Sequence, residues 1–168
     1  MVSEKANPDA SNGPSGEDLR KALATFPTGI AIVTTFDGEE PIGATANAVT
    51  SLSLDPPLIL ACLDRRSRTL EAIEASGKFG VNGLASEHAD LARSFSDPGT
   101  RETRWEGLDW RESLGSPRLG QMPLWVGCSL HDLVEGGDHL IVIGAVEEIE
   151  GRDADPLIFH GGDYHGLR

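Results

Sequence analysis

Short polar side chains recur with the two-residue spacing of a β-strand in one stretch of the chain. Successive side chains on a strand point to opposite faces, so Thr45, Asn47, Ser51 and Ser53 are expected to share one face of a strand over residues 42–54. The opposite face would be small and mostly apolar and would carry Ala44, Ala46, Ala48, Leu52 and Leu54. Buried hydroxyl and amide groups cost free energy unless they find hydrogen-bond partners. A flat ring with donors and acceptors along its edge, such as a flavin, would supply those partners.

Residues 64–69 read Asp-Arg-Arg-Ser-Arg-Thr and connect an expected strand to an expected helix. The first turn of a helix has free N–H groups and the positive end of the helix dipole, which together attract anions. The hydroxyls of Ser67 and Thr69 and three guanidinium groups add to this attraction. The segment therefore suits a phosphate group. An ordinary capped helix with solvated arginines is the alternative, and the neighbouring polar strand favours the phosphate.

His139 follows Gly136-Gly137-Asp138 at the start of an apolar strand. A histidine there can donate a hydrogen bond or carry a positive charge at the mouth of a barrel, where it would hold a nicotinamide carboxamide or offset charge on a reduced flavin. The alternative is a half-exposed histidine of a turn. No pattern typical of a catalytic nucleophile is present, and no metal site is expected. A cofactor would then carry the chemistry.

The elements that must position these groups are mostly short strands. Helices are expected over 19–26 after a Ser15 cap, over 68–75 after a Ser67 cap, and in a short segment after Ser86 that carries Phe95. Strands are expected over 30–36, 42–54, 58–63, 79–84, 125–134, 139–149 and 157–160, with an irregular, functional loop over 96–121. Both faces of 58–63 and 139–149 are apolar, which suits a closed barrel or a sheet covered on both sides. The predicted fold class is mainly β, a β-barrel with flanking helices, in one domain over 17–168 after a disordered tail over 1–16.

The bulk composition limits the possible partners. The 168 residues carry a formal net charge of −13, which argues against nucleic acid because binding its phosphates requires lysine and arginine. No apolar run approaches the ~20 residues of a membrane span, and the N-terminus shows no secretion signal. Both cysteines, Cys62 and Cys128, lie in apolar runs and are expected to be buried. A cytoplasmic protein with no membrane or nucleic-acid partner is therefore expected.

Six segments resemble one family in their order and spacing. They are Pro-Thr-Gly-Ile over 27–30, Gly-Ala-Thr-Ala-Asn over 43–47, Thr-Ser-Leu-Ser-Leu-Asp-Pro-Pro over 50–57, Phe-Gly-Val-Asn over 79–82, Gly-Asp-His-Leu-Ile-Val-Ile-Gly over 137–144 and Pro-Leu-Ile-Phe over 156–159. The set is similar to the short-chain flavin reductases that serve as the reductase component of two-component flavin-dependent monooxygenases. The resemblance runs from about Leu19 to Leu167. The chain departs from the family pattern at Ala48 and Val49, where a hydroxyl and an aromatic side chain are common.

The resemblance implies a split β-barrel homodimer that binds FMN or FAD, with NADH or NADPH over the flavin ring. The residues it implies at the cofactors are Thr28, Thr45, Ala46, Asn47, Ser51, Ser67, Arg68, Thr69, Phe95, His139 and Tyr164. Among them, residues 45–47 would edge the isoalloxazine ring, residues 67–69 would lie near the flavin phosphate, and Phe95 would lie along the flavin. His139 would be the catalytic residue on the nicotinamide side, and Tyr164 would close that pocket.

The function implied is an NAD(P)H-dependent flavin reductase that supplies reduced flavin to a separate monooxygenase component. Two alternatives remain open: a split-barrel flavoprotein that keeps its FMN and acts on another substrate, and a flavin-binding protein without turnover. The choices between FMN and FAD and between NADH and NADPH also stay open. Residues 65–68 could bind the ribose 2′-phosphate of NADPH instead of the flavin phosphate.

Overall fold

The computed structural model describes residues 13–167, so most of the predicted tail over 1–16, together with Arg168, lies outside the described residues. In chain order the elements are α1 (Gly16–Leu23), β1 (Thr28–Gly29), β2 (Ala31–Asp37), β3 (Glu40–Ala46), β4 (Val49–Leu54), β5 (Pro57–Asp64), α2 (Arg68–Ser76), β6 (Lys78–Gly83), η1 (Ser86–His88), α3 (Ala89–Ser96), η2 (Pro98–Thr100), β7 (Trp110–Ser113), β8 (Ser116–Leu119), β9 (Leu124–Gly136), β10 (His139–Gly151), β11 (Ile158–His160) and β12 (Asp163–His165). Between residues 13 and 167, no helix is both long and apolar enough to cross a membrane.

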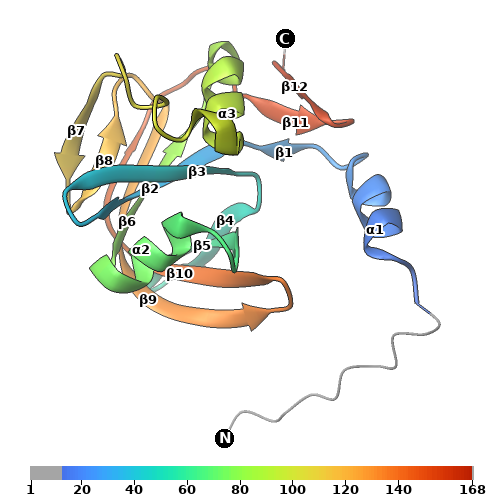
Figure 1. Ribbon diagram of the computed structural model, residues 1–168, viewed down its shortest axis with the longest axis horizontal. Coiled ribbons are helices and arrows are strands. Elements are labelled where there is room, and N and C mark those ends of the chain that lie inside the picture. Colours follow the sequence, from blue (N-terminus) through green and yellow to red (C-terminus); the bar gives the residue numbers. More distant parts are fainter. Residues whose placement is uncertain (1–12, 168) are drawn as a thin grey trace, which may run out of the picture.

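One curled sheet dominates the fold (Figure 1). Its seven antiparallel strands lie in the order β3-β2-β6-β9-β10-β5-β4. The two edge strands, β3 and β4, are consecutive in the chain, with only Asn47 and Ala48 between them. The sheet must therefore curl until its two edges approach each other at this point. No hydrogen-bonded pairing of β3 with β4 closes the described strands, so the barrel is split along this seam.

The predicted strand over 42–54 is wrong in one respect, because the structure divides it at the seam. Thr45 on β3 pairs with Ile32 of β2, whereas Ser51 on β4 pairs with Ile59 of β5. The expected single polar face therefore does not exist as one continuous surface. The alternation of polar and apolar residues continues through residues 47 and 48, where the chain bends between β3 and β4. The sequence pattern therefore gave no sign of this break.

Apolar side chains fill the inside of the curled sheet and also cover part of its outer face. The inner cluster includes Val33, Phe79 and Val142, and α2 adds Leu70 and Ile73 to it. A second cluster lies between the sheet and α3, and includes Ile32, Leu84, Phe95 and Leu157. β2 is buried on both faces for this reason, and its β-branched apolar run suits such a position. The mainly β prediction is confirmed.

The structure also corrects several predicted boundaries. α1 ends at Leu23, before Phe26, and the predicted loop over 96–121 contains the β7–β8 hairpin. The helical segment after residue 85 begins with η1, whose N-terminal cap is Ala85 rather than Ser86. Trp105 and Trp110 of this loop pack on the second cluster.

The outward face of β5 is only half-buried, although the strand was predicted to be buried on both faces. Ile59, Ala61 and Leu63 point into the core, while Leu58, Leu60 and Cys62 alternate with them on the other face. Of the two cysteines, Cys128 is buried as predicted, and burial raises the pKa of its thiol to about 12. Cys62 lies on the half-buried outer face, which corrects the prediction that it is a core residue.

His88 stabilises the start of the α3 region in its neutral form. Its Nδ1 accepts a hydrogen bond from the Ala85 N–H at 3.0 Å, and burial lowers the pKa of the imidazole below its ordinary value. The folded protein therefore binds this proton less readily than the unfolded chain does. The stabilisation is present above the unfolded-state pKa of ~6.5 and is lost as the pH falls through the lowered pKa.

We therefore expect acidification from about pH 7 to about pH 5 to lower Tm more in the wild type than in His88→Gln. A thermal unfolding series at several pH values measures this difference. His131→Gln, which changes an exposed histidine, is the matched control. Equal acid sensitivity of wild type and His88→Gln would contradict the assignment.

Candidate functional site

A cavity of about 890 Å³ opens between β3, the start of α2 and the segment that follows α3. Four of the residues predicted to bind the cofactor line it: Ser67, Arg68, Thr69 and Phe95. The β3 wall includes Gly43, where a Cβ atom would lie 3.1 Å from both the Phe95 ring and the Val33 carbonyl oxygen. Glycine therefore lets the Phe95 ring pack directly on the strand and shapes the floor of the cavity.

The α2 end of the cavity has unused hydrogen-bond donors. Ser67 is the N-cap residue of α2, as predicted, but its side chain makes no capping hydrogen bond. Its hydroxyl and the first N–H groups of the helix are thus available to a ligand. This arrangement suits an anionic group such as a phosphate.

The arginines beside this helix start are already paired with carboxylates. Arg66 donates to Asp64 through Nε at 3.1 Å and Nη2 at 2.8 Å, and these hydrogen bonds hold the pKa of Asp64 well below its usual range. Arg68 donates from Nη2 to the Asp37 carboxylate at 2.8 Å. The predicted anion site is therefore less positive than the three arginines alone suggest.

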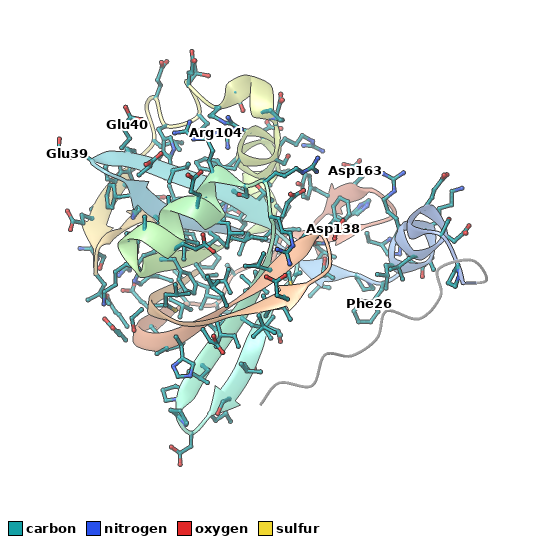
Figure 2. The ribbon with its side chains drawn as sticks, turned by 60° about the horizontal axis from the view of Figure 1, so that its bottom comes forward. Phe26, Glu39, Glu40, Arg104, Asp138 and Asp163 are labelled. Carbon is teal, nitrogen blue, oxygen red and sulfur yellow. The ribbon has the colours of Figure 1, made fainter. Side chains whose placement is uncertain are left out.

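His139 stands beside the same connection between β5 and α2. It lies opposite Asp64 in the β5–β10 register, and Arg65 fixes the β9–β10 turn by donating from Nε to the Gly137 carbonyl oxygen at 2.6 Å. The imidazole Nδ1 lies 2.8 Å from the Asp138 carboxylate, and this hydrogen bond lowers the pKa of Asp138. Figure 2 shows Asp138 at the tip of this hairpin. Among the described residues, the imidazole Nε2 has no hydrogen-bond partner and remains available to a ligand.

Tyr164 and Thr28 lie on the small sheet β1-β11-β12 rather than in the cavity. The Tyr164 ring packs against Phe159 at 5.5 Å between centroids, and the Arg93 guanidinium lies 5.2 Å from the Tyr164 centroid. Arg93 also pairs with Asp163 at 2.9 Å. Within residues 13–167, the Thr28 hydroxyl is buried without a hydrogen-bond partner.

The predicted ring-edge residues lie at the seam end of β3. Thr45 donates its hydroxyl proton to the Ala92 carbonyl oxygen at 2.7 Å, so it attaches α3 to the sheet. Ala46 is buried, whereas Asn47 is exposed between β3 and β4. Ser51 is exposed on β4, the other edge strand. These four residues continue from the cavity wall toward the seam but do not line the cavity itself.

Arg101 and Arg104 also line the cavity, from the segment after α3, and neither was predicted as a site residue. Arg104 donates from Nη1 to the carbonyl oxygens of Gly43 at 3.2 Å and Phe95 at 3.1 Å, and from Nη2 to that of Asp97 at 2.7 Å. Its Nε is buried and has no partner. The loop was predicted to be functional, but carbonyl partners that only the fold brings together leave no pattern in the sequence.

Comparison with known proteins identifies the family. The family profile described as "Flavin reductase like domain" matches residues 23–168. The chain belongs to the flavin reductase family. It is 40% identical over 154 residues to the HsaB reductase subunit of a flavin-dependent monooxygenase from Mycobacterium tuberculosis, which covers 89% of the chain and 81% of the relative. A second curated relative, a probable flavin reductase of Rhizobium meliloti, is 40% identical over 148 residues, and the chain spans 47% of its length.

Solved structures of flavin reductases share the fold. Component B of nitrilotriacetate monooxygenase from Mycobacterium thermoresistibile superposes with a TM-score of 0.86 at 37% identity, covering 90% of this chain and 86% of that one. The NADH:FAD oxidoreductase SgcE6 of Streptomyces globisporus gives a TM-score of 0.82 at 33% identity, covering 89% and 90%. The predicted split-barrel fold is confirmed, and the prediction of a flavin reductase is confirmed at the level of the family.

The residues of the cavity fit a flavin nucleotide. The uncapped Ser67 hydroxyl at a helix N-terminus, the Phe95 side chain, and the side chains of Arg101 and Arg104 line one space. The volume of about 890 Å³ lies within the range of ~300–1,000 Å³ typical of sites for small ligands.

Proposed function

We propose that the protein reduces free FMN or FAD with NADH or NADPH and releases the reduced flavin to a separate monooxygenase component. The observation that carries this proposal is the cavity at the uncapped start of α2, with His139 beside the same β5–α2 connection. The bound flavin would supply the redox chemistry by accepting a hydride from the nicotinamide. Family membership and the reductase subunits among the relatives support this activity.

The chain positions a flavin through backbone donors and small side chains. The phosphate would lie at residues 67–69, Phe95 would pack along the flavin, and residues 45–47 would edge its ring toward the seam. Ser51, on the facing edge strand, would bind near the ribityl chain. The hydrogen bond from Thr45 to Ala92 keeps α3, and therefore Phe95, at a fixed height above β3.

The paired arginines favour release of the flavin. Asp64 and Asp37 already offset the charges of Arg66 and Arg68, so a phosphate at α2 would gain less from them than from two free guanidinium groups. A reductase that hands its product to another protein needs this moderate affinity. The charge distribution thus supports a diffusing flavin rather than a permanent one.

His139 is the residue proposed for the nicotinamide side. Its Nδ1–H donates to the Asp138 carboxylate, so the free Nε2 of a neutral ring would accept a hydrogen bond from the carboxamide NH2 group, whereas a protonated ring would donate one and offset charge near the flavin ring. Tyr164, fixed by Phe159 and Arg93, would close this pocket, with Thr28 contributing its partnerless hydroxyl.

We also propose that the protein forms a homodimer, because a single chain leaves apolar side chains of the sheet exposed. On the outer face of the sheet, Ile143 pairs with Leu60 and Ile141 with Cys62, all only half-buried. The β4–β5 hairpin extends from the body (Figure 2), and its Leu54 is 89% exposed. Helix α1 has no buried residue and presents an apolar stripe to solvent. A second copy of the chain would cover these surfaces, since monomers rarely expose contiguous apolar patches.

The proposal is tested by following NADH and NADPH oxidation with and without added FMN, FAD or riboflavin. We expect at least one flavin to accelerate oxidation in proportion to protein concentration. The failure of all three flavins with both nucleotides would contradict the proposed activity. A cytoplasmic location stays a prediction, which cell fractionation would test.

A further inference from the structure

Two arginines in the cavity have no carboxylate partner. Arg104 is held only by three carbonyl oxygens, and the Arg101 guanidinium makes no hydrogen bond or ion pair within residues 13–167. Arg66 and Arg68, in contrast, each bind a carboxylate. The strongest uncompensated positive charge of the cavity therefore lies on the segment after α3, away from the start of α2.

The two guanidinium groups lie close enough to repel each other. Burial lowers the pKa of Arg104, and the positive charge of Arg101 lowers it further, while Asp97 acts in the opposite direction. Asp97 accepts the Gly99 N–H at 2.8 Å, and Glu102 is the other carboxylate of this segment at the cavity. A bound anion would relieve the repulsion between the two arginines, so this pair favours a negatively charged ligand.

The cavity thus has two anion-binding regions on different segments. One consists of the Ser67 hydroxyl and the first N–H groups of α2, and the other of Arg101 and Arg104. FMN carries one phosphate, whereas FAD carries two linked phosphates and an adenosine. The volume of about 890 Å³ lies near the upper end of the usual range for ligand sites, and Trp105 adds an aromatic side chain beside Arg104.

We propose that the Arg101–Arg104 end of the cavity binds the adenylate half of FAD, so that this protein prefers FAD to FMN. The inference rests on the proposed function, in which the flavin phosphate lies at the start of α2. Arg101 contacts the second phosphate, and Arg104 holds the β3 and α3 carbonyl groups in place while adding positive charge. The adenosine then lies beside Trp105.

Equilibrium binding tests this assignment without any turnover. Quenching of flavin fluorescence, or calorimetry, gives Kd for FMN and FAD with the wild type, Arg101→Ala and Arg111→Ala. Arg111 is exposed on β7 outside this cavity, so its variant controls for the loss of one positive charge. We expect the wild type to bind FAD about tenfold more tightly than FMN. Arg101→Ala should reduce that preference to about twofold or less by weakening the binding of FAD, while Arg111→Ala should retain the tenfold preference.

Three outcomes would overturn the inference. The wild type could bind FMN and FAD with equal affinity, or Arg101→Ala could weaken the binding of both flavins equally. In the third outcome, Arg101→Ala changes only the KM for NADPH. The last result would assign the arginines to the 2′-phosphate of the nicotinamide nucleotide. If the two flavins bind with equal affinity and flavin still stimulates NADH oxidation, the FAD preference is wrong and the proposed function stands. If the protein prefers FAD but oxidises no NADH, the proposed function is wrong and the FAD preference stands.

Discussion

Ile143→Asp should convert the proposed homodimer into monomers and lower flavin-stimulated NADH oxidation by at least tenfold. Ile143 lies opposite Leu60 on the uncovered outer face of the sheet. A carboxylate buried there without a partner would cost several kcal/mol. The expected loss of activity follows from the topology, because the two strands of the proposed interface lead directly into the site. β5 ends at Asp64, and β10 begins at His139.

Size-exclusion chromatography with light scattering measures the change in mass, and circular dichroism verifies that the variant is folded. Ile149→Asp is the matched control, because Ile149 also lies on β10, is 69% exposed and pairs with Val126 rather than with β5. It should remain dimeric and active. A wild type that already elutes as a monomer would contradict the proposed dimer. An Ile143→Asp protein that remains a dimer would contradict the placement of the interface on this face.

His139→Ala should lower kcat/KM for the nicotinamide nucleotide by about 100-fold, which is the size of effect seen when one well-placed hydrogen-bonding group is removed from an active site. The Kd for the flavin should change little, because His139 does not line the cavity. Asp138 holds the imidazole through Nδ1, so Asp138→Asn should show a smaller loss in the same direction. Steady-state kinetics at several nucleotide concentrations separates these effects.

His131→Ala provides the control, since His131 is an exposed histidine on the neighbouring strand β9. Its kinetics should match those of the wild type. Unchanged turnover in His139→Ala would support a protein that binds flavin without using this residue. A parallel loss of flavin affinity would instead show that His139 acts on the flavin rather than on the nicotinamide.

Local chemistry in the sequence was enough to predict most individual elements. Helix α2 begins after Ser67 and ends at Gly77, whose positive φ of 67° is the left-handed conformation that glycine adopts at helix ends. The β9–β10 hairpin turns at Gly137, with a φ of 76°. Both signals lie within a few residues of the feature they specify, which is why they could be found.

Features that depend on distant contacts could not be predicted in the same way. The break between β3 and β4 arises because the sheet must bring its edges together, and no local residue specifies it. Arg104 reaches the carbonyl oxygen of Gly43 across 61 positions of the chain. The incomplete burial of Leu60 could not be predicted either, because the residue types of an apolar strand do not show whether the rest of the chain covers both of its faces.

Reduction of a flavin pool in the absence of oxygen distinguishes a reductase that releases its product from a protein that keeps its flavin. With NADH in excess over FAD or FMN, and the flavin in excess over protein, we expect the visible absorbance of the whole pool to disappear. Each chain would then have reduced and released many flavins. Bleaching that stops at one flavin per chain would indicate a protein that keeps its cofactor, and the absence of bleaching would indicate a passive binder. Either result would contradict the proposal that the protein reduces free flavin and releases it.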